Sequence, residues 1–448
     1  MPRITLSACP VVLVVFVRGG CAQEEAPAVV RCEPAHLAVD VDAATTKELV
    51  VTFDRPMDTR GWSVCGGGPA FPKIKGRPRY ETPRKLVIEV ELEPDHDYAM
   101  SLNCGAAKNF RSKEGTPLLP VPWTFSTAPR DLPDPRVQTK ANRDALAELR
   151  DLLPRAYSYY DLRVADWPGL WSKHEAAILG AKTTRGFASA VASVLAATED
   201  IHLHLRLGDQ VFAAGRRAID PLYRSRLVGK YFDTKPAGDN ALVGRNDEGI
   251  GYLMVATWGS RKDADAVEAT LPQLRDCKAI VVDVRPNAGG DEALARRVAE
   301  WFVDGTKTYA KNRYRIAAGR DGFGPVLDRQ ITGNTDADEQ IRCPIAVLTS
   351  RYVMSSNESF VMMLQQAPDC TVVGQPTYGS SGNPRPHELT NGVVVVLPSW
   401  QDLRLDGTCL EGEGIAPDVP VEVDARDDRD RDPILERALD VLRGKLGK

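Results

Sequence analysis

The sequence lacks the residue patterns that mark metal and nucleic-acid sites. Only six of its 448 residues are histidines, and none of its nine cysteines forms a Cys-x-x-Cys pair or a Cys/His spacing typical of a metal. The net charge is −4, with no basic patch, which argues against nucleic acid as a partner. No internal repeat or low-complexity tract is present, which argues against a repeat architecture. We therefore expect an enzyme or binding protein without metal or cofactor.

An apolar run long enough to cross a membrane is also lacking. The run at the N-terminus extends from Ile4 to Val17, after Arg3 and before Arg18-Gly19-Gly20-Cys21-Ala22. About 14 apolar-dominated positions are too few for a membrane span, and the pattern resembles a secretory signal over residues 1–22. Lipidation of Cys21 is the alternative, although Arg18 stands where such sites usually carry an aliphatic residue. Both readings predict export to the periplasm, the cell envelope or the extracellular space.

The remainder of the chain is long enough for two or three domains. Residues 27–128 predict an all-β domain, because β-branched segments such as 48–53 and 85–90 alternate with turns rich in glycine and proline. After a proline-containing linker, residues 137–200 show helical periodicity and predict a small bundle. Residues 201–448 then become strand-rich, and from Gly249 strands alternate with helices, which indicates an α/β core. In an oxidising compartment Cys65 and Cys104 could pair within the first domain.

The N-terminal domain carries a resemblance of its own. Val51-Thr52-Phe53-Asp54-Arg55-Pro56-Met57-Asp58 and the closing Trp123-Thr124-Phe125-Ser126-Thr127 resemble bacterial immunoglobulin-like domains. That resemblance implies a β-sandwich used for spacing or binding.

Two strand–loop–helix segments in the α/β core carry the candidate chemistry. In the first, strand 279–285 runs into Pro286-Asn287-Ala288-Gly289-Gly290, which offers backbone N–H groups beside paired glycines. In the second, strand 345–349 leads to Ser355 at the start of a helix. An oxyanion site and a nucleophile on adjacent strand ends are what a serine hydrolase needs.

Each segment also has a purely structural interpretation. Ser355-x-x-Glu358 fits a capping box, in which the serine hydroxyl and the glutamate both bond N–H groups of the helix start. Gly289-Gly290 fits an ordinary strand-to-helix turn. Neither the G-x-G-x-x-G spacing of a dinucleotide site nor a Gly-Lys-Ser/Thr phosphate loop is present here.

Four motifs in order give these segments a family. They are Asp283-Val284-Arg285-Pro286-Asn287-Ala288-Gly289-Gly290, Ser355-Ser356-Asn357-Glu358, Val373-Gly374-Gln375-Pro376-Thr377-Tyr378-Gly379 and Glu411-Gly412-Glu413-Gly414-Ile415-Ala416-Pro417-Asp418. Together they resemble the tail-specific (C-terminal processing) and tricorn-like serine peptidases. The resemblance implies a crotonase-like α/β core and peptide hydrolysis. It also implies a nucleophile, oxyanion donors and supporting residues, which are Ser355; Gly289 or Gly290, with Ser356; and Asp283, Arg285, Asn287 and Glu358.

The general base divides this family. The processing branch uses a lysine in the loop after the nucleophile helix, where this chain has Ser380. The tricorn-like branch uses a histidine from an earlier Asp-x-His segment, and Asp200-Ile201-His202 stands at that place. A histidine with a pKa of about 6.5 is a suitable base at neutral pH. The resemblance therefore implies His202 as the base, the alternative being an ordinary strand histidine.

The group that orients the imidazole is open at this stage. Glu411 aligns with the acid of the tricorn-like tetrad, although Glu413 lies two residues on. The tetrad also has a serine just before the histidine, where this chain has Ile201, and Ser380 or Ser381 could substitute for it.

We expect an exported serine peptidase that acts on peptides or proteins. About 45 residues separate Leu205 from Gly249, too few for the PDZ domain that many tail-specific peptidases carry there. The departure at Ile201 leaves open a non-catalytic protein of the same fold that binds a small ligand or peptide. A hydrolase of non-peptide esters or amides is a third hypothesis, because its site chemistry would be identical.

Overall fold

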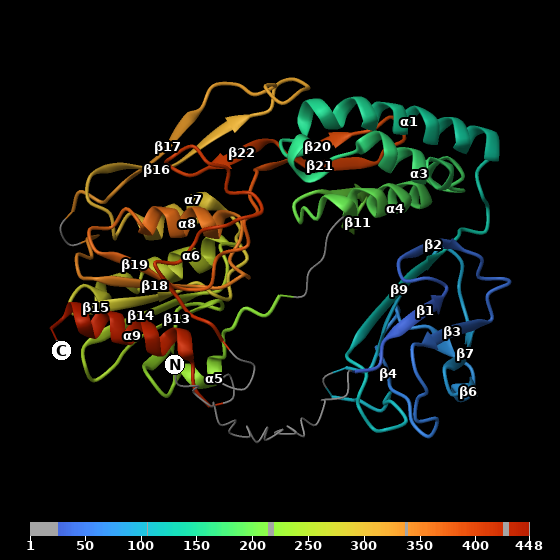
Figure 1. Ribbon diagram of the computed structural model, residues 1–448, viewed down its shortest axis with the longest axis horizontal. Helices are drawn as coiled ribbons and strands as arrows, with labels where there is room; N and C mark the ends of the chain where they lie inside the picture. Colours follow the sequence, from blue (N-terminus) through green and yellow to red (C-terminus); the bar gives the residue numbers. More distant parts are fainter. Residues whose placement is uncertain (1–25, 105, 214–218, 337–338, 424–429, 448) are drawn as a thin grey trace, which may run out of the picture. The chain divides into compact units, whose positions relative to one another are not determined.

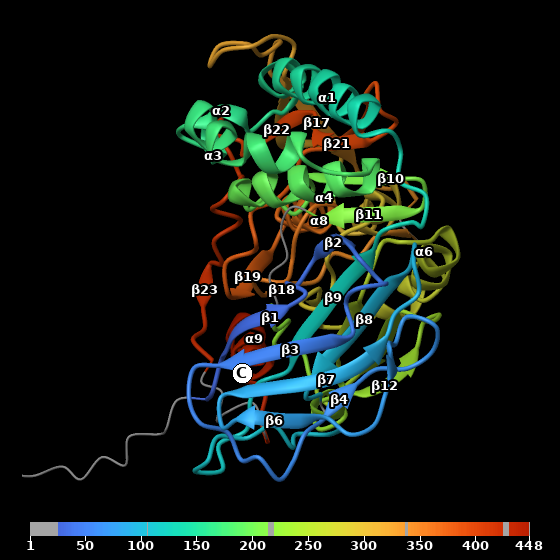
Figure 2. The same ribbon diagram turned by 90° about the vertical axis from the view of Figure 1, so that its right-hand side faces the viewer.

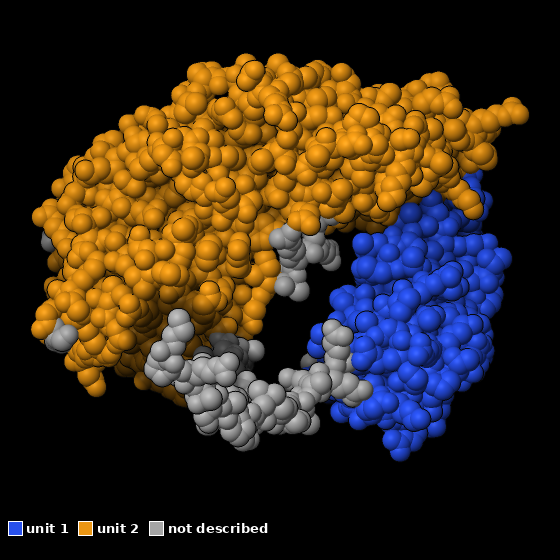
Figure 3. Space-filling model, in the orientation of Figure 1, with its two compact units in different colours: residues 1–132 blue, residues 133–448 orange. Residues whose placement is uncertain are grey.

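The computed structural model describes residues 26–104, 106–213, 219–336, 339–423 and 430–447. The predicted signal segment 1–22, with the candidate lipidation site Cys21, lies outside the described residues. The chain divides into two compact units, residues 1–132 and 133–448, which Figure 3 colours separately. The division falls within the linker predicted between Ala128 and Arg136.

The first unit consists of two β-sheets that share one core. One sheet has the order β1 (Val29–Glu33), β3 (Glu48–Phe53), β7 (Lys85–Glu91) and β5 (Lys73–Ile74), with β6 (Arg79–Thr82) beside β7. The other has the order β2 (Ala38–Val41), β9 (Val121–Thr127), β8 (Asp97–Leu102) and β4 (Val64–Cys65). Figure 2 shows the strands of both sheets. Alternate residues of β3, β7, β8 and β9 bury their side chains in the shared core. The Cys65 and Cys104 thiols are both free and lie within hydrogen-bonding distance of each other.

A seven-stranded sheet forms the centre of the second unit. Its order is β12 (Asp233–Pro236), β13 (Ala241–Arg245), β14 (Ile250–Val255), β15 (Ala279–Asp283), β18 (Ile345–Thr349), β19 (Cys370–Gly374) and β23 (Val419–Pro420). From β14 to β23 neighbouring strands are parallel, whereas β12 and β13 are antiparallel additions. The segment between Leu205 and Gly249, which is too short for a PDZ domain, thus supplies β12 and β13 of the main sheet.

Helices cover both faces of this sheet. On one face lie α6 (Arg261–Glu268), η2 (Leu271–Leu274), α7 (Glu292–Ala299) and α8 (Ser356–Leu364), and on the other α5 (Ser225–Val228) and α9 (Pro433–Lys445) (Figure 1). Consecutive residues of β15 alternate between the two cores, since Ile280 and Val282 pack under α7 while Ala279 and Val281 pack under α9. Helix α7 ends at Ala299.

A second lobe of this unit combines helices with a small sheet. Its helices are α1 (Pro135–Ala156), α2 (Tyr160–Arg163), α3 (Trp167–Leu179), α4 (Thr184–Leu195) and η1 (Ala196–Thr198). They share a core with the sheet β11 (Gln210–Ala213), β10 (His204–Leu207), β21 (Val394–Pro398) and β20 (Pro384–Glu388). A third sheet has the order β17 (Leu327–Thr332), β16 (Thr306–Tyr314) and β22 (Trp400–Leu403). Segments from residue 384 onward therefore complete a lobe that begins at residue 135.

Candidate active site

Ser355 lies in a strained turn directly before α8. Its backbone angles are φ 58° and ψ −136°, a region that non-glycine residues rarely adopt. The Ser355 hydroxyl forms no hydrogen bond with the helix start, so the capping-box interpretation is wrong. The side chain is partly exposed, and a serine presented on a strained strand-to-helix turn resembles the nucleophile elbow of other hydrolases.

Glu358 reaches the loop after β19 instead of the helix start. Its buried carboxylate accepts hydrogen bonds from the Thr377 hydroxyl, from Gly379 N–H at 2.8 Å and from Ser380 N–H at 3.0 Å. Burial raises the pKa of Glu358 to about 7, because the carboxylate has lost its water and has no cation beside it. The glutamate therefore fixes the conformation of the loop that contains Ser380.

Ser380 connects the nucleophile turn with the candidate base. Its carbonyl accepts the N–H of Ser355 at 2.8 Å, and its hydroxyl shares a hydrogen bond with His202 Nδ1 at 2.9 Å. Ser380 is fully buried, so both contacts are shielded from water. Ser380 thus joins Ser355 and His202, which come from different lobes.

His202 lies between η1 and β10 and is held by its own segment. Its backbone N–H donates to Asp200 Oδ1 at 2.9 Å, and the Tyr157 hydroxyl donates to Asp200 Oδ2 at 2.8 Å. Burial lowers the pKa of His202 below its usual value, while the negative charge of Asp200 opposes that shift. The imidazole is therefore neutral at pH 7, as a general base requires.

Glu411 lies in the same region without bonding to His202. Arg163 of α2 donates to one carboxylate oxygen, and Ser381 N–H donates to the other at 3.2 Å. Burial raises the pKa of Glu411 well above its usual range, and the nearby Asp200 acts in the same direction. The expected contact between Glu411 and the imidazole is absent from the described residues, because Arg163 occupies the carboxylate. The alternative Glu413 forms an exposed ion pair with Arg404 at 3.2 Å.

The paired glycines lie directly against the nucleophile. A Cβ atom added at Gly289, where φ is +109°, would lie 2.8 Å from Ser355 Cβ. At Gly290 it would lie 2.5 Å from the backbone of Trp258. Neither position tolerates a side chain, so the glycines are required by close approach as well as by backbone geometry.

Two asparagines organise the glycine loop and the start of α8: Asn287 binds one N–H group, and Asn357 joins the two segments. Asn287 Oδ1 accepts the N–H of Gly289 at 2.8 Å, whereas within the described residues the N–H groups of Gly290 and Ser356 have no acceptor. Asn357, on the first turn of α8, donates to the carbonyls of Val284 and Asn287 at 3.2 and 3.0 Å. The glycine loop and the nucleophile helix are thereby joined side chain to backbone.

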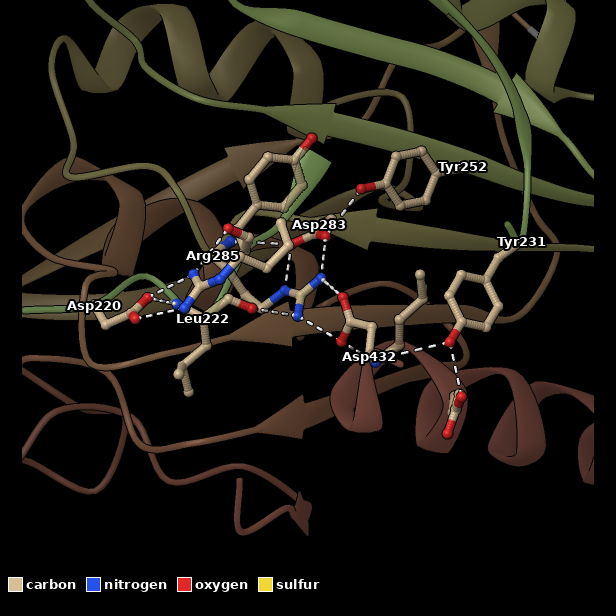
Figure 4. A network of polar contacts seen from close by, with 11 residues as sticks. Asp220, Leu222, Tyr231, Tyr252, Asp283, Arg285 and Asp432 are labelled. Carbon is tan, nitrogen blue, oxygen red and sulfur yellow. Dashed lines mark hydrogen bonds and ion pairs between the residues drawn. The ribbon is translucent and has the colours of Figure 1, made fainter. Parts of the chain in front are cut away.

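Asp283, the last residue of β15, and Arg285 anchor the loop that contains Gly289 and Gly290. The buried Arg285 guanidinium forms two hydrogen bonds with Asp283, at 2.9 and 2.7 Å, and two with Asp432, both at 2.8 Å (Figure 4). Asp432 also caps α9 by accepting the N–H of Leu435 at 3.0 Å. The loop is therefore tied to the N-terminus of the last helix, a connection that no local sequence pattern indicates.

A second buried network supports the loop from the three-stranded sheet. Asp402 of β22 accepts the Ser381 hydroxyl at 2.9 Å and the Arg329 guanidinium at 2.7 Å. Arg329 of β17 also donates to Glu292 and to Ser359 of α8, the latter at 3.0 Å. Sequence analysis missed Asp402 and Arg329, because neither belongs to a motif and both act through contacts between distant segments.

The described residues contain no cluster of three or more histidine, cysteine, aspartate or glutamate side chains arranged to hold a metal ion. Across the same parts of the chain, no helix combines the length and the apolar character that spanning a membrane requires.

Comparison with known proteins finds similarity to serine peptidases. The model of Peptidase family S41 matches residues 249–421, which contain both strand–loop–helix segments. A Staphylococcus aureus protein named as a CtpA-like serine protease is 27% identical over 176 residues, 39% of this chain and 33% of that protein. The carboxy-terminal processing protease CtpA of Bacillus subtilis is 22% identical over 180 residues, 40% of this chain and 36% of that protein. The chain thus spans about a third of the length of these curated relatives.

Solved structures share the fold. A candidate peptidase from Parabacteroides merdae superposes with a TM-score of 0.60 at 23% identity, over 67% of this chain and 96% of that chain. Mature CPAF superposes with a TM-score of 0.51 at 11% identity, over 68% of this chain and 97% of that chain. Residues 249–421 of this chain are thus similar to peptidase family S41, and the second unit shares its fold with these solved structures.

Proposed function

We propose that this protein is an exported serine peptidase in which Ser355 is the nucleophile and His202 the general base. The observation that carries the proposal is the double contact of Ser380, whose carbonyl bonds Ser355 N–H and whose hydroxyl bonds His202 Nδ1. The strained turn at Ser355 and the close packing of Gly289 against it support the same assignment. The match of residues 249–421 to Peptidase family S41 supports peptide bonds as the bonds cleaved.

The hydrogen bond at Nδ1 defines the role of each imidazole nitrogen. When Nδ1–H donates to Ser380 Oγ, the neutral ring has its lone pair on Nε2, and Nε2 takes the Ser355 proton as Oγ attacks the scissile carbonyl. The proton then passes to the leaving amine, and a water molecule hydrolyses the acyl-enzyme by the reverse proton path. Ser380 thereby performs the orienting role that the tricorn-like tetrad gives to the residue at Ile201.

Gly290 N–H and Ser356 N–H are the proposed oxyanion donors. Gly289 N–H is excluded from this role because it donates to Asn287. Each donor aimed at the developing oxyanion is worth roughly 100- to 1000-fold in rate in measured cases. Asn287 and Asn357 are positioning residues, since they hold the two donor-bearing loops together.

Glu411 is proposed to act on the loop and not on the imidazole. It accepts Ser381 N–H, while Asp200 supplies the negative charge near His202. For the rest of the chain we propose an immunoglobulin-like sandwich over residues 27–128, a helical bundle over 137–200 and a crotonase-like core over 201–448. Export by the N-terminal segment 1–22, with lipidation of Cys21 as the alternative, follows from the sequence pattern.

A fluorophosphonate probe tests the assignment. We expect covalent labelling of the wild type, no labelling of Ser355→Ala and slow labelling of His202→Ala. Ser193→Ala, which removes an exposed hydroxyl on α4, is the control and should label as the wild type does. A wild-type protein that is folded and unlabelled would refute the peptidase proposal in favour of a non-catalytic binding protein. A labelled protein that hydrolyses esters or amides but no peptide in a library would identify a different hydrolase.

A further inference from the structure

Two of the three residues that form a cationic and aromatic surface come after the Ser380 loop in the sequence. Arg385 of β20 is exposed, and its guanidinium carbon lies 5.5 Å from the centre of the Tyr314 ring. The Tyr314 ring lies 5.5 Å from the Trp400 ring, edge to face at 65°. We name these three residues the Arg385 platform.

Strand alternation places the platform on the face that holds the catalytic loop. Trp400 and Asp402 are two residues apart on β22, so their side chains point to the same face, and Asp402 bonds the Ser381 hydroxyl. Tyr314 is directly opposite Trp400 in the β16–β22 register. The backbone N–H of Trp400 also donates to the carbonyl of Gly382 at 3.2 Å. The platform is therefore attached to the loop two residues beyond Ser380.

The positive charge of Arg385 is not neutralised by the described part of the protein. Arg329, whose guanidinium lies 5.0 Å from the Trp400 ring, is paired with Asp402 and Glu292. Arg385, in contrast, forms no ion pair with any described residue. Glu388, also on β20, points to the opposite face of the strand. The platform thus presents one cation without a counterion.

The stacked arrangement suits a carboxylate. A guanidinium stacked on an aromatic ring keeps its N–H edge free, and that planar edge matches the two oxygens of a carboxylate. His387, on the same face as Arg385, has its pKa lowered by burial and by the charge of Arg385, so it is neutral at pH 7. Pro384 and Pro386 have no N–H to offer an added strand, which favours recognition of a side chain over recognition of a peptide backbone.

We propose that Arg385, which lies over the Tyr314 ring, binds an acidic side chain of the peptide substrate, so that the enzyme prefers aspartate or glutamate near the scissile bond. This inference rests on the proposed peptidase function, since it assigns a substrate class to the same site. Tyr314 holds the guanidinium in place, Trp400 packs against the Tyr314 ring, and Arg385 is the residue that sets specificity.

A peptide library in which each position carries either glutamate or glutamine tests the proposal. With wild-type enzyme we expect kcat/KM to favour glutamate at one position by about five- to tenfold, as for a partly exposed charge-assisted contact. Arg385→Met, which keeps the apolar stem, should reduce that ratio to about one and leave the glutamine peptides nearly unaffected. Arg143→Met, an exposed arginine on α1, is the matched control and should keep the preference.

Labelling with the fluorophosphonate probe distinguishes failure of the specificity proposal from failure of the proposed function. Labelled wild-type enzyme that shows no glutamate preference, or an Arg385→Met variant that keeps the preference, would overturn the specificity proposal alone. Wild-type enzyme without labelling would overturn the proposed function instead. If labelled enzyme cleaves no library peptide, protection of Ser355 from the probe decides, because hexaglutamate should slow labelling more than hexaglutamine in the wild type and equally in Arg385→Met. Equal protection in the wild type would overturn the proposal.

Discussion

Replacing Ser380 with alanine tests the proposed catalytic arrangement most directly. The substitution removes one hydroxyl, which bonds His202 Nδ1 at 2.9 Å. It leaves the backbone contacts of residue 380 with Ser355 and Glu358 intact. Any loss of rate therefore reports on the imidazole and not on the position of the nucleophile turn.

The expected magnitude follows from when the imidazole becomes charged. In the ground state the ring is neutral, and a neutral hydrogen bond contributes about 0.5–1.5 kcal/mol. In the transition state the ring is an imidazolium, and a hydrogen bond to a charged group contributes about 1.5–3 kcal/mol. Since the barrier rises by the difference between these two contributions, about 1–1.5 kcal/mol, we expect kcat to fall about 5- to 13-fold. The melting temperature should fall by only about 2–4 °C.

Single-turnover labelling and steady-state cleavage measure this effect, and the neighbouring Ser381→Ala is the matched control. The Ser381 hydroxyl bonds Asp402 and does not touch His202, so its removal should cost stability with a smaller loss of kcat. If Ser380→Ala keeps kcat within about twofold of the wild type, below the cost of even a weak hydrogen bond, while His202→Ala is inactive, another group orients the base and the reasoning is refuted.

Three further predictions concern the same site. Gly289→Ala should abolish labelling, since its Cβ would lie 2.8 Å from Ser355 Cβ at a φ of +109°, and labelling at a wild-type rate would contradict that packing. The acidic limb of the kcat/KM profile should lie below pH 6.5, because the lowered pKa of His202 keeps the base neutral to lower pH; a limb above pH 8 would indicate a lysine-like base. The folded-state pKa of Glu358, about 7, exceeds the ordinary 4.5, so folded protein binds the extra proton and stability falls as pH rises from 4.5 through 7. Urea unfolding of wild type and Glu358→Gln should show about 3 kcal/mol of this pH dependence in the wild type only, and equal slopes would contradict it.

The local elements of the α/β core could be predicted from the sequence. Strand β18 has the bounds expected from its apolar run. It is a short-range feature, in which β-branched residues fix the element locally. The resemblance to a serine peptidase family, which comparison confirms for residues 249–421, could likewise be predicted because its motifs are contiguous.

The supporting contacts could not be predicted in the same way. Glu358 fits a capping box, but tertiary structure draws its carboxylate to the loop at Gly379 and Ser380, and Ser355 adopts a φ that prevents capping. Asp432 carries a local signal only as a helix cap, whereas its bond to Arg285 joins residues 147 positions apart. The motifs and periodicity of a single sequence do not indicate which distant residues form such pairs.

The pairing of β10 with β21 has a consequence for the order of events during biosynthesis. Strand β10, which follows His202, pairs with residues 394–396 of β21. The hydroxyl that bonds the imidazole belongs to Ser380. Loop closures of this length are slow and form late in folding. In a chain still emerging from the ribosome, neither His202 nor its support is therefore held in place. The topology itself leaves the proposed site unassembled until nearly all of the chain has been synthesised.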